Sequence, residues 1–170
     1  CIELNSLSKS HNMPGWRVGM CVTNATWVQW MLKVKTNIDS GTFRGIQLAA
    51  AEAITGNTTE WHTYYNKEVY QRRRVIAEKI MKAIGCTFAP QQTGLFLWGK
   101  IPESITDAEQ LTEHLLHQHG IFVAPGFIFG SNGKRYVRLS LCANEARMQE
   151  ALQRITSKQD NKPIIEQQNS

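Results

Sequence analysis

Hydrophobic residues recur every three or four positions along much of this chain, and this spacing predicts amphipathic helices. The predicted helices lie within residues 24–39, 42–55, 57–85, 106–119 and 144–155. Glycine or a cluster of turn residues follows several of them, as expected at helix ends. The helix within 57–85 is the longest, at roughly 25 residues or about 38 Å with a rise of about 1.5 Å per residue. Trp27 and Trp30 fall on the apolar stripe of the first helix and are therefore predicted to be core residues.

Shorter stretches of alternating or continuous apolar residues predict strands, bounded by glycine and proline. They lie at residues 1–4, 16–22, 86–89 and 95–98, at a stretch beginning at Ile121, and at 136–141. In the last stretch Arg138 alternates with Val137 and Leu139, so its side chain points away from the apolar side of the strand. Together the elements predict an α+β fold, in which helices cover one face of a small sheet. Two further strands, from a larger parallel sheet, precede this domain.

The composition is that of an ordinary globular protein. The 170 residues are 42% hydrophobic and 19% charged, and no apolar run reaches the roughly 18 residues of a membrane span. A chain of this length buries roughly 70% of its unfolded surface, which suits one domain or slightly more. The net charge of +5 is compatible with nucleic acid, but only Arg72, Arg73 and Arg74 cluster, and a solvated helix face explains them. We therefore expect neither a nucleic-acid nor a membrane partner.

Cysteine and histidine give no metal site. The four cysteines lack close metal-type spacing, and no signal peptide is found. They are expected to be reduced thiols in a cytoplasmic protein. His114, His117 and His119 lie close together in the sequence, but no carboxylate or cysteine is positioned to complete a zinc site. A charged outer helix face is the preferred interpretation of the three histidines.

Residues 6–19 contain the clearest chemical signal in the sequence. Lys9 stands between two serines, a Pro-Gly turn follows, and Arg17 comes eight positions after the lysine. A lysine attacks a carbonyl usefully when its amine is partly desolvated or already bound covalently to the carbonyl carbon. Hydroxyl groups and an arginine fork suit a phosphate dianion. This combination predicts a pyridoxal 5′-phosphate site, and the alternative is a solvated, serine-rich turn.

Two motifs in this stretch carry a resemblance to a known family. Ser-x-Ser-Lys at residues 6–9 and Gly-Trp-Arg-x-Gly at residues 15–19 resemble the signature of class I/II aminotransferases, the fold-type-I pyridoxal-phosphate enzymes. The resemblance implies that Lys9 is the catalytic lysine and holds the cofactor covalently. It implies that the cofactor phosphate is held by three residues, Ser6, Ser8 and Arg17.

A second resemblance concerns Arg138. No acid adjoins this arginine in the strand, which suggests an external anion, and the planar guanidinium suits a carboxylate. The alternative is a surface arginine on an edge strand. Pro-Gly-x-x-Phe-Gly at residues 125–130, followed by Tyr-Val-Arg-Leu-Ser at 136–140, is similar to the C-terminal motif of the same aminotransferases. The resemblance implies that Arg138 binds the α-carboxylate of the substrate.

The resemblance also implies a domain organisation. The chain opens on Cys1, and Lys9 comes nine residues in, whereas the family places this lysine past the middle of a chain more than twice as long. We therefore expect a C-terminal fragment. Residues 1–24 would be the end of the large cofactor-binding domain, residues 25–157 the C-terminal small domain, and residues 158–170 a polar tail.

The function implied is pyridoxal-phosphate-dependent transfer of an amino group between an amino acid and a 2-oxo acid, by an enzyme that is a homodimer in this family. The isolated chain is expected to be inactive, because in the family the contacts to the cofactor ring come from N-terminal residues. Two alternatives stay open. One is a related pyridoxal-phosphate lyase or synthase, and the other is the aminotransferase-like sensor domain of a transcription regulator.

Overall fold

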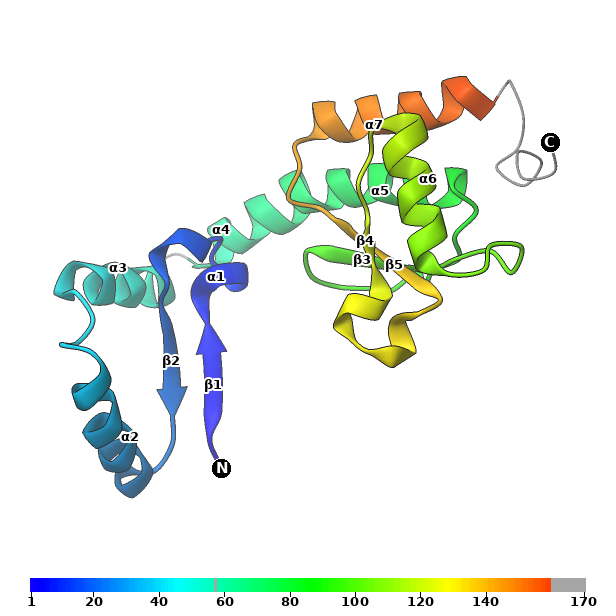
Figure 1. Cartoon of the computed structure of the whole chain (residues 1–170). Helices are drawn as coiled ribbons and strands as arrows, with labels where there is room; N and C mark the ends of the chain where they lie inside the picture. Colours follow the sequence, from blue (N-terminus) through cyan, green and yellow to red (C-terminus); the bar gives the residue numbers. More distant parts are fainter. Residues whose placement is uncertain (57, 160–170) are drawn as a thin grey trace. The chain divides into compact units, whose positions relative to one another are not determined.

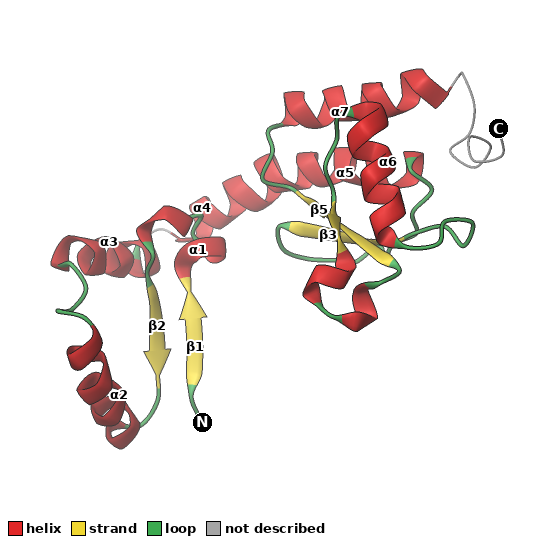
Figure 2. Cartoon of the chain, in the orientation of Figure 1, coloured by secondary structure: helices red, strands yellow, loops and turns green. Residues whose placement is uncertain are grey.

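The structure is a computed structural model that describes residues 1–56 and 58–159, and its contacts divide the chain into two compact units (Figure 1). The first unit is Cys1–His62 and the second is Thr63–Ser170. Each unit contains its own small sheet (Figure 2). The domain boundary expected between residues 24 and 25 falls inside the first unit. That these parts belong to the large and small domains of a longer enzyme stays a prediction. Within the expected polar tail, residues 160–170 lie outside the described part of the chain.

The first unit begins with a pair of strands, β1 (Glu3–Ser6) and β2 (Gly19–Val22). They pair antiparallel, with Glu3 opposite Val22 and Ser6 opposite Gly19, whereas the sequence analysis expected strands of a parallel sheet. The connection explains the difference, because it holds only the four-residue helix α1 (Leu7–Ser10) and a three-residue 3-10 segment. Parallel neighbours need a longer crossover connection.

Helices α2 (Ala25–Ile38) and α3 (Arg44–Thr55) follow, at the positions that the apolar spacing predicts. Asn24 caps α2, because its side chain accepts a hydrogen bond from the backbone N–H of Trp27 at 3.1 Å. The expected burial of the α2 stripe is wrong for this chain. Trp27 is 44% exposed and Trp30 is 57% exposed. The spacing identifies an apolar face correctly, but no described part of the chain covers it.

The exposed apolar surface of the first unit predicts self-association of the 170-residue chain. Leu4 and Val22 on the strand pair are exposed like the two tryptophans. Apolar patches of this kind usually mark an interface, and the unpaired strand edges add backbone groups that favour pairing with another chain. Sedimentation velocity should show a concentration-dependent dimer or larger species, weakened by Trp30→Glu. A monomer at all concentrations, with rapid amide exchange throughout residues 1–22, would contradict this expectation.

Helical residues extend without interruption in the sequence from Thr58 to Ala83. They comprise α4 (Thr58–Thr63), a π-helical segment (Tyr64–Tyr70) and α5 (Gln71–Ala83). The prediction of one long helix within residues 57–85 is confirmed in extent, although the π-helical segment was not expected. Residue 57, at which the predicted range begins, lies outside the described residues. Gly85 has φ +75°, and its N–H donates to the Lys82 carbonyl at 3.0 Å. It therefore ends the helix in the left-handed conformation that glycine tolerates.

The sheet of the second unit has three antiparallel strands in the order β3 (Phe96–Lys100), β5 (Tyr136–Ser140), β4 (Ala124–Pro125). The strand expected at residues 86–89 is only a single bridge, in which Thr87 pairs with Lys100 through two backbone hydrogen bonds of 2.7 and 2.9 Å. Two helices complete the unit, α6 (Ala108–His119) and α7 (Glu145–Gln159). The N-cap of α6 is Asp107, whose side chain accepts from the Gln110 N–H, one residue later than expected.

One face of this sheet carries the hydrophobic core. Leu97, Val137 and Leu141 are fully buried there. Helices α5, α6 and α7 contribute further buried side chains, among them Ile80, Met81, Leu111, Leu115 and Ile155. Burying a side chain of this size contributes about 1.5 to 3 kcal/mol relative to exposure. The expected α+β fold, with helices on one face of a small sheet, is confirmed.

The cluster Arg72–Arg74 and the histidines of α6 are less solvent-exposed than expected. Arg73 and Arg74 are half-buried and donate hydrogen bonds to backbone carbonyls, at 3.1 Å to Leu141 and 2.8 Å to Gly94. Only the first arginine of the cluster forms an exposed ion pair. Such carbonyl contacts depend on loops distant in sequence, which local patterning does not show.

The histidines likewise do not share one outer face. His119 is buried, with its Nδ1 3.0 Å from the Arg154 carbonyl oxygen. His114 is half-buried, and burial, followed by the nearby charge of His119, lowers the pKa of its imidazole. Only His117 stays on the surface, beside Glu113. Over residues 1–56 and 58–159 no group of side chains is arranged to hold a metal ion.

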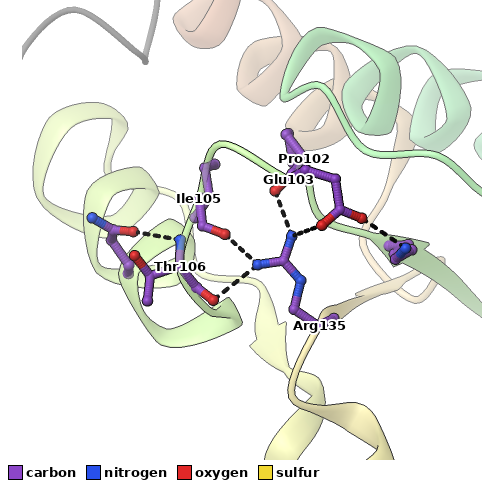
Figure 3. A network of polar contacts seen from close by, with 7 residues as sticks. Pro102, Glu103, Ile105, Thr106 and Arg135 are labelled. Carbon is purple, nitrogen blue, oxygen red and sulfur yellow. Dashed lines mark hydrogen bonds and ion pairs between the residues drawn. The ribbon is translucent and has the colours of Figure 1, made fainter.

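Arg135 connects the start of β5 to the chain between β3 and α6 (Figure 3). Its guanidinium donates to three backbone carbonyls, those of Pro102 at 2.7 Å, Thr106 at 2.9 Å and Ile105. It also pairs with Glu103 at 3.3 Å. One half-buried side chain therefore satisfies several carbonyl groups of this connection, and such charge-assisted bonds are stronger than neutral ones.

Arg135→Ala should lower the free energy of unfolding by about 3 kcal/mol, because hydrogen bonds to charged groups contribute about 1.5 to 3 kcal/mol each and partly compensate one another when lost. Arg72→Ala is the matched control. Arg72 forms an exposed i,i+4 pair with Glu68, so its loss should cost only about 0.5 kcal/mol. Urea denaturation followed by circular dichroism measures both. If both variants lost the same free energy of unfolding, the Arg135 contacts would contribute little to stability.

Candidate cofactor and substrate site

The loop between β1 and β2 carries the predicted lysine. Helix α1 begins after Ser6, which has extended backbone angles and accepts a hydrogen bond from the Ser8 N–H at 3.2 Å on its hydroxyl oxygen. Serine is a favoured N-cap residue because its hydroxyl satisfies a free N–H of the first turn. The serine motif therefore builds the turn that presents Lys9. The structure places Ser6, Ser8 and Lys9 within this one turn, and Lys9 is exposed.

Leu7 fixes this loop from within. Its side chain is only 2% exposed, and its N–H donates to the Val18 carbonyl at 3.3 Å. Its own carbonyl accepts from the N–H groups of His11 and Met13, at 3.2 and 3.3 Å. One buried leucine thus closes the loop, while the polar side chains on either side of it remain outside.

Arg17 has an unusual backbone conformation, with φ 52° and ψ 45°. Within residues 1–56 and 58–159, Asn12 and Arg17 are the residues other than glycine with positive φ. The left-handed region costs a residue with a Cβ atom roughly 1 to 2 kcal/mol. Nη1 of Arg17 donates to the Pro14 carbonyl at 3.1 Å, which fixes the side chain over the preceding turn. Strain of this kind is typical of functional positions.

The donor set of this loop fits a phosphate group joined to an aldehyde. It offers two serine hydroxyls, one guanidinium and one amine within a single loop of the first unit. A phosphate dianion accepts several charge-assisted hydrogen bonds, and a lysine amine condenses with an aldehyde. No described residue pairs Arg17 with a carboxylate. The loop can therefore bind the two functional groups of pyridoxal phosphate.

His11 lies at the end of the same loop. Its Nδ1 is 2.9 Å from the Ser10 hydroxyl, and its ring packs edge-on against His62 with centroids 5.4 Å apart. These contacts join the loop to the end of α4 in the first unit. They give His11 a structural role in this unit.

Arg138 lies in β5, the central strand of the second sheet, opposite Trp98 on one side and Ala124 on the other. The alternative of a surface arginine on an edge strand is therefore wrong. Val137 is fully buried on the core face, so Arg138 points to the opposite face, as the alternation predicts. No described carboxylate pairs with Arg138. Its guanidinium is consequently available for an external carboxylate.

Aromatic side chains surround Arg138, and the sequence analysis did not assign them a role. Its guanidinium carbon Cζ lies 4.1 Å from the ring centroids of both Phe96 and Phe129. Phe129 also packs edge-on against Trp98, with centroids 5.4 Å apart. Phe129 belongs to the Pro-Gly-x-x-Phe-Gly motif, so the motif itself was the available signal.

The predicted site residues thus form two groups. Ser6, Ser8, Lys9 and Arg17 come together in the lysine loop of the first unit. Arg138 lies in the second unit, with its own aromatic neighbours. The first group suits an aldehyde and a phosphate, and the second suits a carboxylate.

A family model described as aminotransferase class I and II matches residues 1–155. LL-diaminopimelate aminotransferase 2 of Trichormus variabilis is 43% identical over 154 residues, which are 91% of this chain and 39% of that protein. LL-diaminopimelate aminotransferase of Oleidesulfovibrio alaskensis is 38% identical over 156 residues, or 92% of this chain and 39% of that protein. The chain therefore spans about two fifths of the length of these relatives.

Solved structures agree in fold. Substrate-bound BacF from Bacillus subtilis is 32% identical, with a TM-score of 0.80 over 95% of this chain and 40% of that chain. An aminotransferase from Staphylococcus aureus is 34% identical, with a TM-score of 0.76 over 92% of this chain and 41% of that chain. The likeness covers both units of the present chain.

Proposed function

Since this chain belongs to the class I and II aminotransferases, we propose that it is the C-terminal part of an enzyme that transfers an amino group between an amino acid and a 2-oxo acid. The cofactor of this family is pyridoxal 5′-phosphate. The observation that carries the proposal is the lysine loop, in which Lys9, two serine hydroxyls and the strained Arg17 share one short connection. This donor set is hard to explain as a solvated turn, because a turn needs no arginine in a costly backbone conformation.

Each site residue has a distinct task in this proposal. When bound, the cofactor supplies an aldehyde for condensation with amines and an electron sink for charge at the substrate α-carbon. Ser6, Ser8 and Arg17 bind its phosphate. Lys9 would hold the cofactor through its aldehyde carbon, and its amine would move the proton of the substrate α-carbon as a general acid and base. Arg138 binds the substrate α-carboxylate and orients the substrate.

The names of the relatives favour a finer proposal. Both curated relatives described above are LL-diaminopimelate aminotransferases, so we take LL-diaminopimelate as the first amino donor to test. Their names favour transfer over the lyase, synthase and sensor alternatives. No described helix is long and apolar enough to cross a membrane. We propose a cytoplasmic homodimer without nucleic-acid or membrane partners.

Lys9→Ala tests the proposed chemistry in the complete enzyme, meaning this chain together with the N-terminal part that its relatives possess. Loss of the general acid and base should lower turnover of LL-diaminopimelate with a 2-oxo acid by about 100-fold or more. The isolated chain, with added pyridoxal phosphate, should show no turnover above its own Lys9→Ala variant. Full activity of the complete Lys9→Ala enzyme would remove Lys9 from the mechanism. Turnover by the isolated chain would show that the N-terminal contacts are dispensable.

Arg138→Ala should damage substrate binding and spare the cofactor. Loss of a bidentate clamp on a carboxylate costs about 1.5 to 3 kcal/mol, or about 10- to 150-fold in kcat/KM. Steady-state kinetics and cofactor titration of the complete enzyme measure the two effects separately, with Arg72→Ala as the control. If Arg138→Ala released the cofactor while leaving substrate affinity intact, Arg138 would be a phosphate or structural residue.

A further inference from the structure

Two aromatic rings from different parts of the second unit lie against the guanidinium of Arg138. Phe96 comes from β3 and Phe129 from the 3-10 segment Gly126–Phe129. Both ring centroids lie 4.1 Å from the guanidinium carbon. A guanidinium stacks on aromatic rings through its faces and donates hydrogen bonds through its edge. A guanidinium that contacts rings through its faces therefore keeps its N–H edge for a ligand.

Aromatic rings hold an arginine in a different way from an acidic partner. A neighbouring carboxylate would fix the guanidinium but would also occupy the N–H groups that bind a substrate carboxylate. A ring fixes the plane and uses none of these donors. Since an unfixed arginine side chain carries about 2 kcal/mol of rotamer entropy, fixing it in advance reduces what is lost when the ligand binds.

Further contacts hold the loop that carries Phe129 and the tryptophan on which its ring packs. Phe129 packs edge-on against Trp98, and Gln92 fixes the Trp98 backbone with two hydrogen bonds, of 2.7 Å to its carbonyl and 2.8 Å from its N–H. Gly126 and Gly133 approach so closely that a Cβ atom on either would collide with the backbone of the other. The loop that carries Phe129 is thus closed tightly, and Phe129 stays against Arg138 although it is 48% exposed.

We propose that Phe96 and Phe129 are positioning residues that fix the guanidinium plane of Arg138 and thereby set the affinity of the enzyme for the substrate carboxylate. The inference rests on the role of Arg138 in the proposed function. It adds two residues to the site, and it gives the ring contacts of Arg138 a role in binding the carboxylate.

The test compares Phe129→Leu and Phe96→Leu with the parent in the complete enzyme. Each substitution should raise KM for the amino acid, and the Kd of a dicarboxylate inhibitor, by about 3- to 30-fold, the range of a cation–π contact. The value of kcat should change by less than about twofold, because the rings are proposed to act through Arg138 and not on the reacting atoms. Phe129→Tyr keeps a ring over the guanidinium and should restore the parent affinity.

Two controls separate positioning from folding. Phe122→Leu removes another exposed phenyl ring of the same unit, 65% exposed, and should leave KM and Kd unchanged. An amine inhibitor without a carboxylate should bind all variants equally well. If the leucine variants lost the same affinity for the amine inhibitor as for the dicarboxylate, the proposal would be overturned. An unchanged Kd of the dicarboxylate in both leucine variants would also overturn it.

A double-mutant cycle with Arg138→Ala distinguishes this proposal from the proposed function. In the Arg138→Ala background, Phe129→Leu should have no further effect on dicarboxylate binding, because no guanidinium remains to be positioned. If Arg138→Ala itself binds the dicarboxylate like the parent, the carboxylate role of Arg138 fails. If Arg138→Ala weakens binding while both leucine variants do not, only the aromatic clamp fails. Nuclear magnetic resonance gives an independent readout, since each leucine variant should change the chemical shift of the Arg138 Nε–H by removing the ring-current contribution of one of the two rings.

Discussion

The one-sided burial of the three-stranded sheet is the constraint on which the placement of Arg138 depends. Val137 and Leu141 must face the helices to bury their side chains, and the two-residue period of a strand then directs Arg138 to the other face. Slipping β5 by one residue would expose the apolar set and bury the arginine. The register with Trp98 and the anchoring of β5 by Arg135 oppose such a slip. Core packing and the side of the sheet on which Arg138 lies are therefore specified by the same few residues.

The lysine loop depends on a different kind of constraint, which is local. One buried leucine, one capping serine and backbone hydrogen bonds over short sequence distances determine its path. Along this path Arg17 adopts the left-handed conformation, which is energetically unfavourable for a residue with a Cβ atom. A loop closed by short-range bonds keeps its geometry largely independent of distant packing. This explains why a short motif in the sequence was sufficient to identify it.

The sequence predicted what depends on local pattern and missed what depends on tertiary partners. The helices and the strands β3 and β5 were predicted because spacing and capping act within a few residues. The apolar stripe of Trp27 and Trp30 was identified, but its exposure was not, since exposure depends on what covers the helix. Arg73 donates a hydrogen bond to the carbonyl of Leu141, which is distant in sequence, and the ring of Phe129 contacts Arg138 in β5. The Arg73 contacts have no signature in local spacing, whereas Phe129 lies in the Pro-Gly-x-x-Phe-Gly motif, which does not by itself reveal the contact with Arg138.

Arg17 and Arg138 illustrate two ways to prepare an arginine for an anion. Arg17 is held by its own strained backbone and by one hydrogen bond to a carbonyl, whereas Arg138 is held by two rings. Neither pairs with a carboxylate among the described residues. An acidic partner would compete with the ligand for the same N–H groups and would weaken the local positive potential. Holding the side chain through backbone and ring contacts avoids this competition, and it leaves most of the hydrogen-bonding capacity of each guanidinium to the anion it is proposed to bind.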